Sequence, residues 1–180
     1  MKRNISFSLL IIGLSVLHVN ASCNCASGGA YGYGNACYKL VNNKYYTFSQ
    51  SYTECASLAA NFGNPLMAMG YSRIAVFTDM SMYLTIMNNV IEPGSTPTVW
   101  LGARATTGGN KLSDYCWMTD VSTPGAQVSL STYTVSQDTI LPVCLSIDAP
   151  AYTHFYGDTC SKDIWYIVCE IGEALKIIPP

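Results

Sequence analysis

Eight cysteines constrain this chain more than any other feature, and all of them lie after residue 22. An even number of cysteines in a secreted protein predicts a disulfide framework. A cysteine zinc site is disfavoured, because no CxxC pair occurs and only one histidine, His154, follows the first cysteine. We therefore expect four disulfides, formed by Cys23, Cys25, Cys37, Cys55, Cys116, Cys144, Cys160 and Cys169.

Residues 1–21 have the pattern of a signal peptide, which places the cysteines in an oxidising compartment. Lys2 and Arg3 make a positive start, "ISFSLLIIGLSVL" is apolar, and "VNA" offers small residues at a cleavage site. The alternative is a retained membrane anchor, but the apolar run is shorter than the roughly 20 residues that span a bilayer. We expect cleavage after Ala21 and a secreted, extracellular protein.

The charge of the remaining chain argues against two classes of partner. Without Lys2 and Arg3, seven basic residues face eleven acidic ones, which gives a net charge of −4. Nucleic acid and anionic membrane surfaces both favour clustered Lys and Arg, and no basic run occurs. We expect neither as a partner, and no segment after residue 21 is apolar and long enough to span a membrane.

Helical patterns precede strand patterns along the chain. After an arm rich in Gly and Cys at residues 22–36, "TFSQ" is a capping box that begins a helix at Thr47, and a second helix is expected within residues 73–89. "LMAM" is short enough to be a strand, and "TVWLGA", "YCWM", "VCLSI" and "IWYIVCE" read as strands. This order predicts an α+β domain with a mostly antiparallel sheet, and residues 119–142 are a long polar loop of the kind that often carries function.

These segments together resemble a C-type lectin-like domain of the long form, over roughly Cys25 to Glu170. "CYKL" resembles the opening strand and "YTECASLAA" the first helix. "VWLGA" resembles the W-[IL]-G signature and "YCWMTD" the strand before the long loop, while "VCLSI" and "YGDTCSKDIWYIVCE" carry the last three core cysteines. The resemblance implies a double-looped α+β fold with two helices and two small antiparallel sheets, in residues 37–171, followed by a short tail at 172–180.

The same resemblance implies the disulfide pairing. Carried over position by position, Cys55 joins Cys169 and Cys144 joins Cys160, while Cys25 with Cys37 matches the additional bond of the long form. Cys23 and Cys116 have no reliable family counterpart. They pair with each other, or Cys23 links two chains, and we favour the internal bond.

The calcium site of the family's sugar-binding members is largely missing. No Glu-Pro-Asn or Gln-Pro-Asp triplet lies between Trp117 and Cys144, where the nearest candidates are Gln137 and Asp138. "YGD" stands where the family has Trp-Asn-Asp, so Asp158 alone is kept. One interpretation is that Asp158 and Asp138 hold a calcium ion weakly, with Asp148 nearby. The other, which we favour, is that Asp158 caps the turn before Cys160.

Binding, rather than catalysis, is the function that these features predict. His154 has no partner nucleophile, and the carboxylate pairs Asp114 with Asp120 and Asp158 with Asp163 fall in or near turns, so we do not expect an enzyme. Tyr133, Tyr152 and Tyr156 are expected near the long loop with Asp138 and Asp158, where they can stack on a sugar ring or contact a protein. We expect carbohydrate recognition, in innate defence as the resemblance implies. The alternative is a calcium-independent protein-interaction domain that uses the long-loop surface.

Overall fold

The computed structural model describes residues 25, 29–58, 71–92, 95, 97–130, 134–137, 142–148 and 153–172. Its first helix, α1, spans Phe48–Leu58 and begins where the capping box predicts. The Thr47 backbone N–H donates to Gln50 Oε1 at 3.0 Å, and the Gln50 N–H donates to Thr47 Oγ1 at 3.3 Å. These two bonds satisfy donors that a helix start otherwise leaves unpaired. "LMAM" lies outside the described residues.

The second helix in the described chain, α3, spans Met80–Val90 and starts later than its apolar spacing suggested. Asp79 caps it by accepting a hydrogen bond from the Met82 N–H at 2.9 Å. An N-cap residue has extended backbone, so the helix cannot include the residues before it. Residues 73 and 74, the start of the segment within which we expected the helix, belong to strand β3, Tyr71–Ile74, instead.

Strands supply the rest of the architecture. They are β1 Tyr31–Tyr33, β2 Ala36–Val41, β4 Thr98–Ala105, β5 Cys116–Met118, β6 Pro124–Gln127, β7 Val135–Gln137, β8 Val143–Asp148, β9 His154–Thr159 and β10 Tyr166–Gly172. A short 3-10 helix, η3, spans Leu112–Asp114. The N-terminal arm thus contributes a strand: β1 and β2 form a hairpin whose turn includes Gly34 at φ 59°, a conformation that glycine adopts readily.

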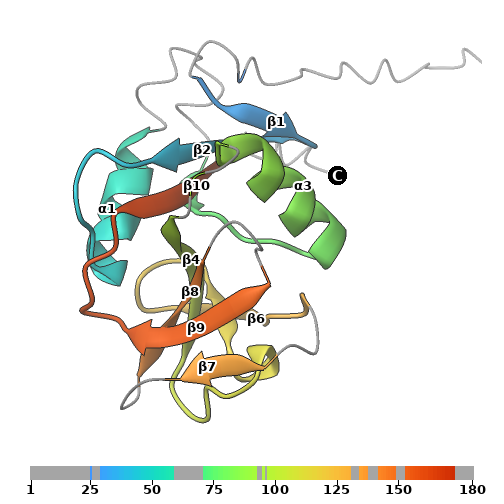
Figure 1. The fold of residues 1–180 in the computed structure, drawn as a ribbon. Coiled ribbons are helices and arrows are strands. Elements are labelled where there is room, and N and C mark those ends of the chain that lie inside the picture. The colour runs from blue at the N-terminus through green and yellow to red at the C-terminus, as the bar shows by residue number, and fades with distance from the viewer. Residues whose placement is uncertain are drawn as a thin grey trace, which may run out of the picture.

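The strands form two antiparallel groups that meet at one short contact. In Figure 1 the upper group holds β1, β2 and β10 beside α1 and α3, and the lower group holds β4, β8, β9 and β7. β10 and β4 join them by a parallel contact of two residue pairs, Tyr166 with Val99 and Ile167 with Trp100. A second parallel contact pairs β7 with β9. The sheet is therefore mixed, although most of its pairs are antiparallel as expected.

The interval 119–142 is more structured than its sequence suggested. It contains β6, which pairs with β5, and β7, which pairs with β9. Every residue of β6 is exposed, so no apolar alternation marks this strand in the sequence. The position of β6 is determined by its backbone pairing with β5 and not by burial of its side chains.

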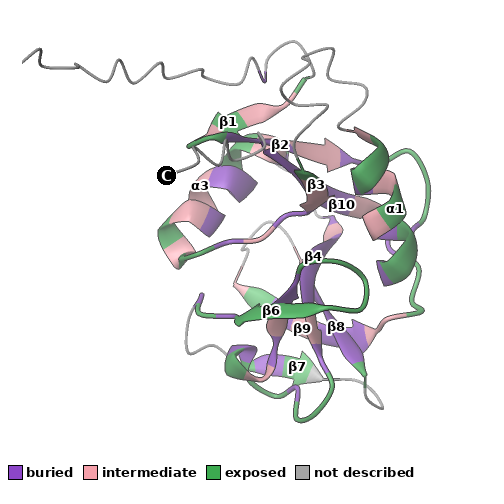
Figure 2. Cartoon of the chain, turned by 180° about the vertical axis from the view of Figure 1, so that it is seen from behind, coloured by how far each residue is buried: buried purple, intermediate pink, exposed green. Residues whose placement is uncertain are grey.

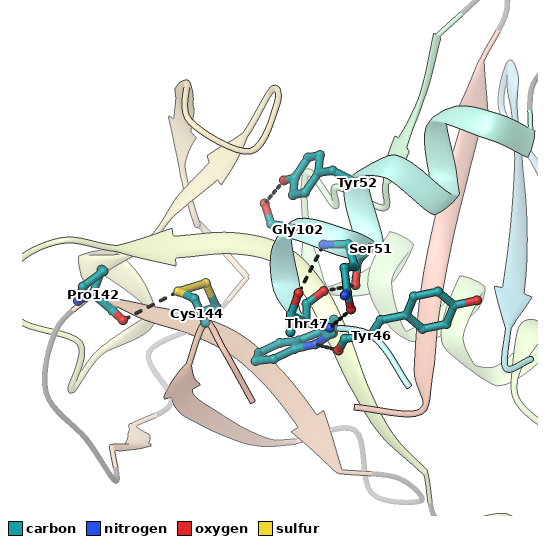
Figure 3. Close-up of a disulfide and its surroundings, with 10 residues drawn as sticks. Tyr46, Thr47, Ser51, Tyr52, Gly102, Pro142 and Cys144 are labelled. Carbon is teal, nitrogen blue, oxygen red and sulfur yellow. Dashed lines mark hydrogen bonds between the residues drawn. A yellow bond between two sulfur atoms is a disulfide. The ribbon is translucent and has the colours of Figure 1, made fainter. Parts of the chain in front are cut away.

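Two large apolar clusters form the core, and a third, small one includes Cys25, Cys37 and Ile171. In Figure 2 much of β4 and β8 is coloured as buried. Phe77 is central to the largest cluster, with its ring 5.2 Å from that of Tyr83 and 5.9 Å from that of Trp117. In the second large cluster, Trp100 Nε1 donates to the Tyr46 carbonyl at 2.9 Å. Figure 3 shows the Tyr52 hydroxyl of α1 directed at the Gly102 carbonyl, 3.4 Å away.

Three disulfides cross this framework, and each is a pair that the resemblance implied. Cys55–Cys169 ties α1 to β10, Cys144–Cys160 ties β8 to the turn after β9, and Cys25–Cys37 ties the N-terminal arm to β2. Neither α1 nor α3 is long and apolar enough to cross a membrane, and the described part of the chain has no other helix that is.

Candidate functional site

Asp158 lies in strand β9 and not in a turn, which corrects our interpretation of "YGD". It is opposite Cys144 of β8, and the turn begins only after Thr159. Its side chain is nearly buried, at 6% exposure, and both carboxylate oxygens are used. Oδ2 accepts a hydrogen bond from Ser146 Oγ at 2.6 Å, and Oδ1 contacts Lys162 Nζ at 2.6 Å.

Lys162 changes what Asp158 can bind. Its ammonium, 48% exposed, reaches back across the Cys160 turn and supplies the positive charge that a buried carboxylate requires. A calcium ion would need several more oxygen ligands and would have to displace this ammonium. Within the described residues, no group of three or more His, Cys, Asp or Glu side chains is placed to hold a metal ion.

Beyond Asp158, one end of β8 and β9 carries a group of polar side chains on a single sheet face. Tyr156 pairs with Ser146, His154 pairs with Asp148, and Asp148 pairs with Thr98 of β4. Directly opposed residues point to the same side of a sheet, so these side chains lie together. We call this surface the β9 face and define it by Thr98, Asp148, His154 and Tyr156; Ser146 is fully buried beneath it.

The β9 face combines an aromatic ring with hydrogen-bonding groups. Thr98 Oγ1 donates to Asp148 Oδ1 at 2.6 Å, which orients that carboxylate. Burial, followed by the nearby Asp148 carboxylate, raises the pKa of the Tyr156 hydroxyl, so this group stays protonated. Tyr156 is half-buried and His154 is exposed. The face can therefore stack an apolar surface on Tyr156 and exchange hydrogen bonds with hydroxyl groups.

The structure does not describe the other side chains that we predicted to bind a ligand. Tyr133, Tyr152 and Asp138, as well as the side chain of Gln137, lie outside what the structure describes. The proposed grouping of Asp138 with Asp158 consequently stays a prediction.

The carboxylates that we considered as catalytic pairs hold loops in place. Asp114 Oδ2 accepts backbone hydrogen bonds from Gly109, Asn110 and Lys111 at 2.8, 3.0 and 3.1 Å, and these bonds lower its pKa. Asp120 Oδ1 accepts from Ser122 and Thr123 in the same way.

The hydrogen bonds from Ser122 and Thr123 lower the pKa of Asp120 to about 2, with the Ser122 backbone N–H as the largest cause. A general acid needs a raised pKa, so Asp120 is unsuited to that role.

Cys116 is a free, half-buried thiol among the described residues. Cys23 itself lies outside the described residues. The expected Cys23–Cys116 bond therefore stays a prediction.

Sequence reasoning also missed a polar cluster around Glu170 of β10. Glu170 is 4% exposed and accepts hydrogen bonds from the Tyr71 hydroxyl at 2.5 Å and from the Val76 N–H at 3.2 Å. Arg73 Nε lies 3.4 Å from its Oε2. The one available signal was an acidic residue inside the apolar strand pattern "IVCEIG". Because Tyr71 and Arg73 come from β3 and Val76 from the segment after it, the cluster joins β3 to β10 and is structural.

Comparison with solved structures identifies proteins that have the same fold. The C-type lectin CEL-I from Cucumaria echinata superposes with a TM-score of 0.51 at 12% identity, over 78% of this chain and 93% of that one. The C-type lectin domain of murine dendritic cell inhibitory receptor 2 gives 0.51 at 11% identity, over 80% and 96%. The carbohydrate-recognition domain of cow CD23 gives 0.51 at 10% identity, over 81% and 94%.

This chain has the C-type lectin-like fold. The expectation drawn from "VWLGA" and the cysteine motifs is confirmed at the level of fold. No family model and no curated protein matches the sequence. At 10–12% identity the solved structures establish the architecture and nothing about the ligand.

Proposed function

We propose that this chain is a secreted binding module that recognises carbohydrate on the β9 face without a calcium ion. In this proposal residues 1–21 are removed on secretion, and the protein has no catalytic activity. The finding that carries the metal-independent part is the Lys162–Asp158 ion pair, with its 2.6 Å contact. The one acidic residue kept from the family's calcium set is already neutralised by a side chain of the same protein.

The chemistry of the β9 face supports a sugar as the ligand. A sugar ring has a C–H face that can lie on an aromatic ring and hydroxyl groups that bond to carboxylates. Tyr156 offers the ring and Asp148, oriented by Thr98, offers the acceptor. Two proteins of the same fold were solved with glycans, murine dendritic cell inhibitory receptor 2 with an N-glycan and cow CD23 with an oligosaccharide.

Protein recognition is the second candidate, and one exposed aromatic pair favours it. Tyr45 and Trp165 are 61% and 37% exposed, and their rings meet edge to face with centroids 4.7 Å apart. Exposed Tyr and Trp side chains in contact are typical anchors of protein interfaces. This pair is separate from the β9 face and involves the segments before α1 and before β10.

A glycan array run with and without chelator tests the proposal. We expect the secreted protein to bind a defined set of glycans equally in both conditions. Tyr156→Ala should weaken binding of the glycans that the β9 face holds, whereas the control Tyr45→Ala, which removes a tyrosine away from that face, should leave the array signal unchanged. Loss of binding in chelator would overturn the metal-independent mechanism. Absence of any glycan signal would overturn carbohydrate recognition. If Tyr45→Ala lost the glycan signal and Tyr156→Ala did not, the binding site would be the Tyr45–Trp165 pair and not the β9 face.

A further inference from the structure

A cavity of about 490 Å³ lies between the β1–β2 hairpin and the C-terminal end of α3. Its volume falls in the range of about 300–1,000 Å³ that is typical of small-molecule sites. It belongs to the half of the molecule that contains β1, β2 and α3, whereas the β9 face belongs to the other half (Figure 1). The cavity is therefore independent of the site proposed above.

Three tyrosines from three strands form the aromatic walls of this cavity. Tyr31 of β1 pairs with Tyr38 of β2, so the two rings rise from the same face of the hairpin. Tyr166 of β10 lines the same space. Tyr38 is buried and forms the floor, while Tyr31 and Tyr166 are half-buried. The Cys25–Cys37 bond attaches the N-terminal arm to β2. Gly29 and Ala30 of this arm form part of the cavity wall.

Polar side chains with unused hydrogen-bonding capacity line the rest. Asn89 Nδ2 donates to the Thr85 carbonyl at 2.8 Å, which leaves Asn89 Oδ1 able to accept. Across the described chain, neither the Asn42 amide nor the Glu92 carboxylate has a side-chain hydrogen bond or ion pair. All three residues are exposed at the opening.

The charges of the lining select the class of ligand. None of the described residues that line the cavity is Lys, Arg or His, so this lining offers no positive charge to an anion. Among the described lining residues Glu92 is the one carboxylate, and it is solvated, which gives little affinity for a cation. A lipid would contact the aromatic walls but make no use of the hydrogen-bonding groups at the opening. A neutral ligand with many hydroxyl groups and an apolar face fits what remains.

We propose that this cavity is a second saccharide site, which holds one end of a neutral glycan between Tyr31 and Tyr166. Asn42, Asn89 and Glu92 exchange hydrogen bonds with its hydroxyl groups. The site needs no metal ion and does not rest on the β9 face.

Amide NMR of the full secreted protein tests this site with defined probes. N-acetylglucosamine, mannose and galactose are each added to ¹⁵N-labelled protein up to their solubility limits. We expect at least one of them to shift the amide signals of Tyr31, Asn89 and Glu92 in a saturable way. If none of the three sugars shifts these signals, the proposal is wrong. The same titration of Tyr156→Ala should be unchanged, which separates this site from the β9 face.

Variants of the hairpin separate binding from folding. Tyr31→Ala should weaken binding of the active sugar about tenfold, and Tyr31→Phe, which keeps the ring, by no more than about threefold. Tyr33→Ala is the matched control, because Tyr33 lies in the same strand but does not line the cavity. Equal losses in Tyr31→Ala and Tyr33→Ala would overturn the proposal. Asn42→Ala, at an exposed position, should fold normally and still weaken binding, and unchanged affinity there would also contradict it.

Discussion

At the residue scale, Asp158 shows how a kept motif residue can take a different role. In the sequence it is the one member of a calcium set that remains. In the structure it is a nearly buried carboxylate, neutralised by Lys162 and hydrogen-bonded by Ser146. Removing one partner of such a pair leaves the other charge uncompensated, whereas removing both charges costs much less. The single variant and the double variant should therefore differ measurably in their free energies of unfolding.

Lys162→Met should destabilise the fold by about 1–2 kcal/mol, a value reduced from that of a fully buried pair because Lys162 is half-exposed. Adding Asp158→Asn to Lys162→Met should restore most of the loss. Urea unfolding with the disulfides intact measures both. If the double variant is as unstable as the sum of the singles, the two side chains do not interact.

Asp120 yields a pH prediction. Its folded pKa of about 2 lies below the value of about 3.9 in an unfolded chain. A lowered pKa means that the stabilisation is present above about pH 4 and disappears as the pH falls through about 2. Carboxyl NMR should show a midpoint near 2, together with shifts of the Ser122 and Thr123 amides. Asp120→Asn should remove the transition, and a midpoint near 4 would show that the loop hydrogen bonds are absent in solution.

At the scale of the element, the ends of the helices decide where they begin. "TFSQ" identified the start of α1 because a capping box is a local pattern with local bonds. The apolar spacing around Val76 suggested a helix too early, because Asp79 caps α3 and residues 71–74 pair with β10 as β3. Periodicity detects a helix, and the cap determines its first residue.

Thr47→Ala should therefore destabilise the protein by about 1 kcal/mol, since it removes the hydroxyl that accepts from the Gln50 N–H. Thr47→Ser retains that hydroxyl and should be nearly neutral. Thermal unfolding followed by circular dichroism compares the two. Equal stability of the alanine and serine variants would mean that the cap contributes nothing.

At the scale of the whole molecule, the disulfides differ in what they hold together. Cys55–Cys169 spans 114 residues and joins the first helix to the last strand, whereas Cys25–Cys37 spans 12 residues within the arm and hairpin. In the chain-entropy model the stabilisation grows with the logarithm of the loop length, which gives about 5 and about 3 kcal/mol.

The double variant Cys55→Ser with Cys169→Ser should accordingly lose more stability than Cys25→Ser with Cys37→Ser. Urea unfolding of the two variants side by side makes the comparison. A larger loss on removing Cys25–Cys37 would show that the hairpin, and not the helix-to-strand tie, dominates the fold.

Metal dependence is also a property of the whole molecule. Because Lys162 neutralises Asp158 and the disulfides constrain the chain at any metal concentration, we expect the melting temperature to be the same in chelator and in millimolar calcium. Differential scanning calorimetry in the two buffers tests this. A rise of many degrees with calcium would reveal a metal site that the ion pair does not block.

Local patterns in the sequence, together with the family resemblance, were sufficient for the fold class. The order of helices and strands, the capping box and the cysteine motifs depend on near neighbours or on a family resemblance, and they predicted the α+β fold and three disulfides. β6 and β7 were not predicted, because every residue of β6 is exposed and short strands without alternation leave no pattern.

Only the tertiary structure decided the chemistry of the candidate sites. Lys162 meets Asp158 because β9 keeps that carboxylate inward while the turn at Cys160 brings the chain back. Tyr31 and Tyr166, 135 positions apart, line one cavity because β1, β2 and β10 are neighbours. These outcomes depend on distances between residues remote in the chain, which composition and periodicity do not contain.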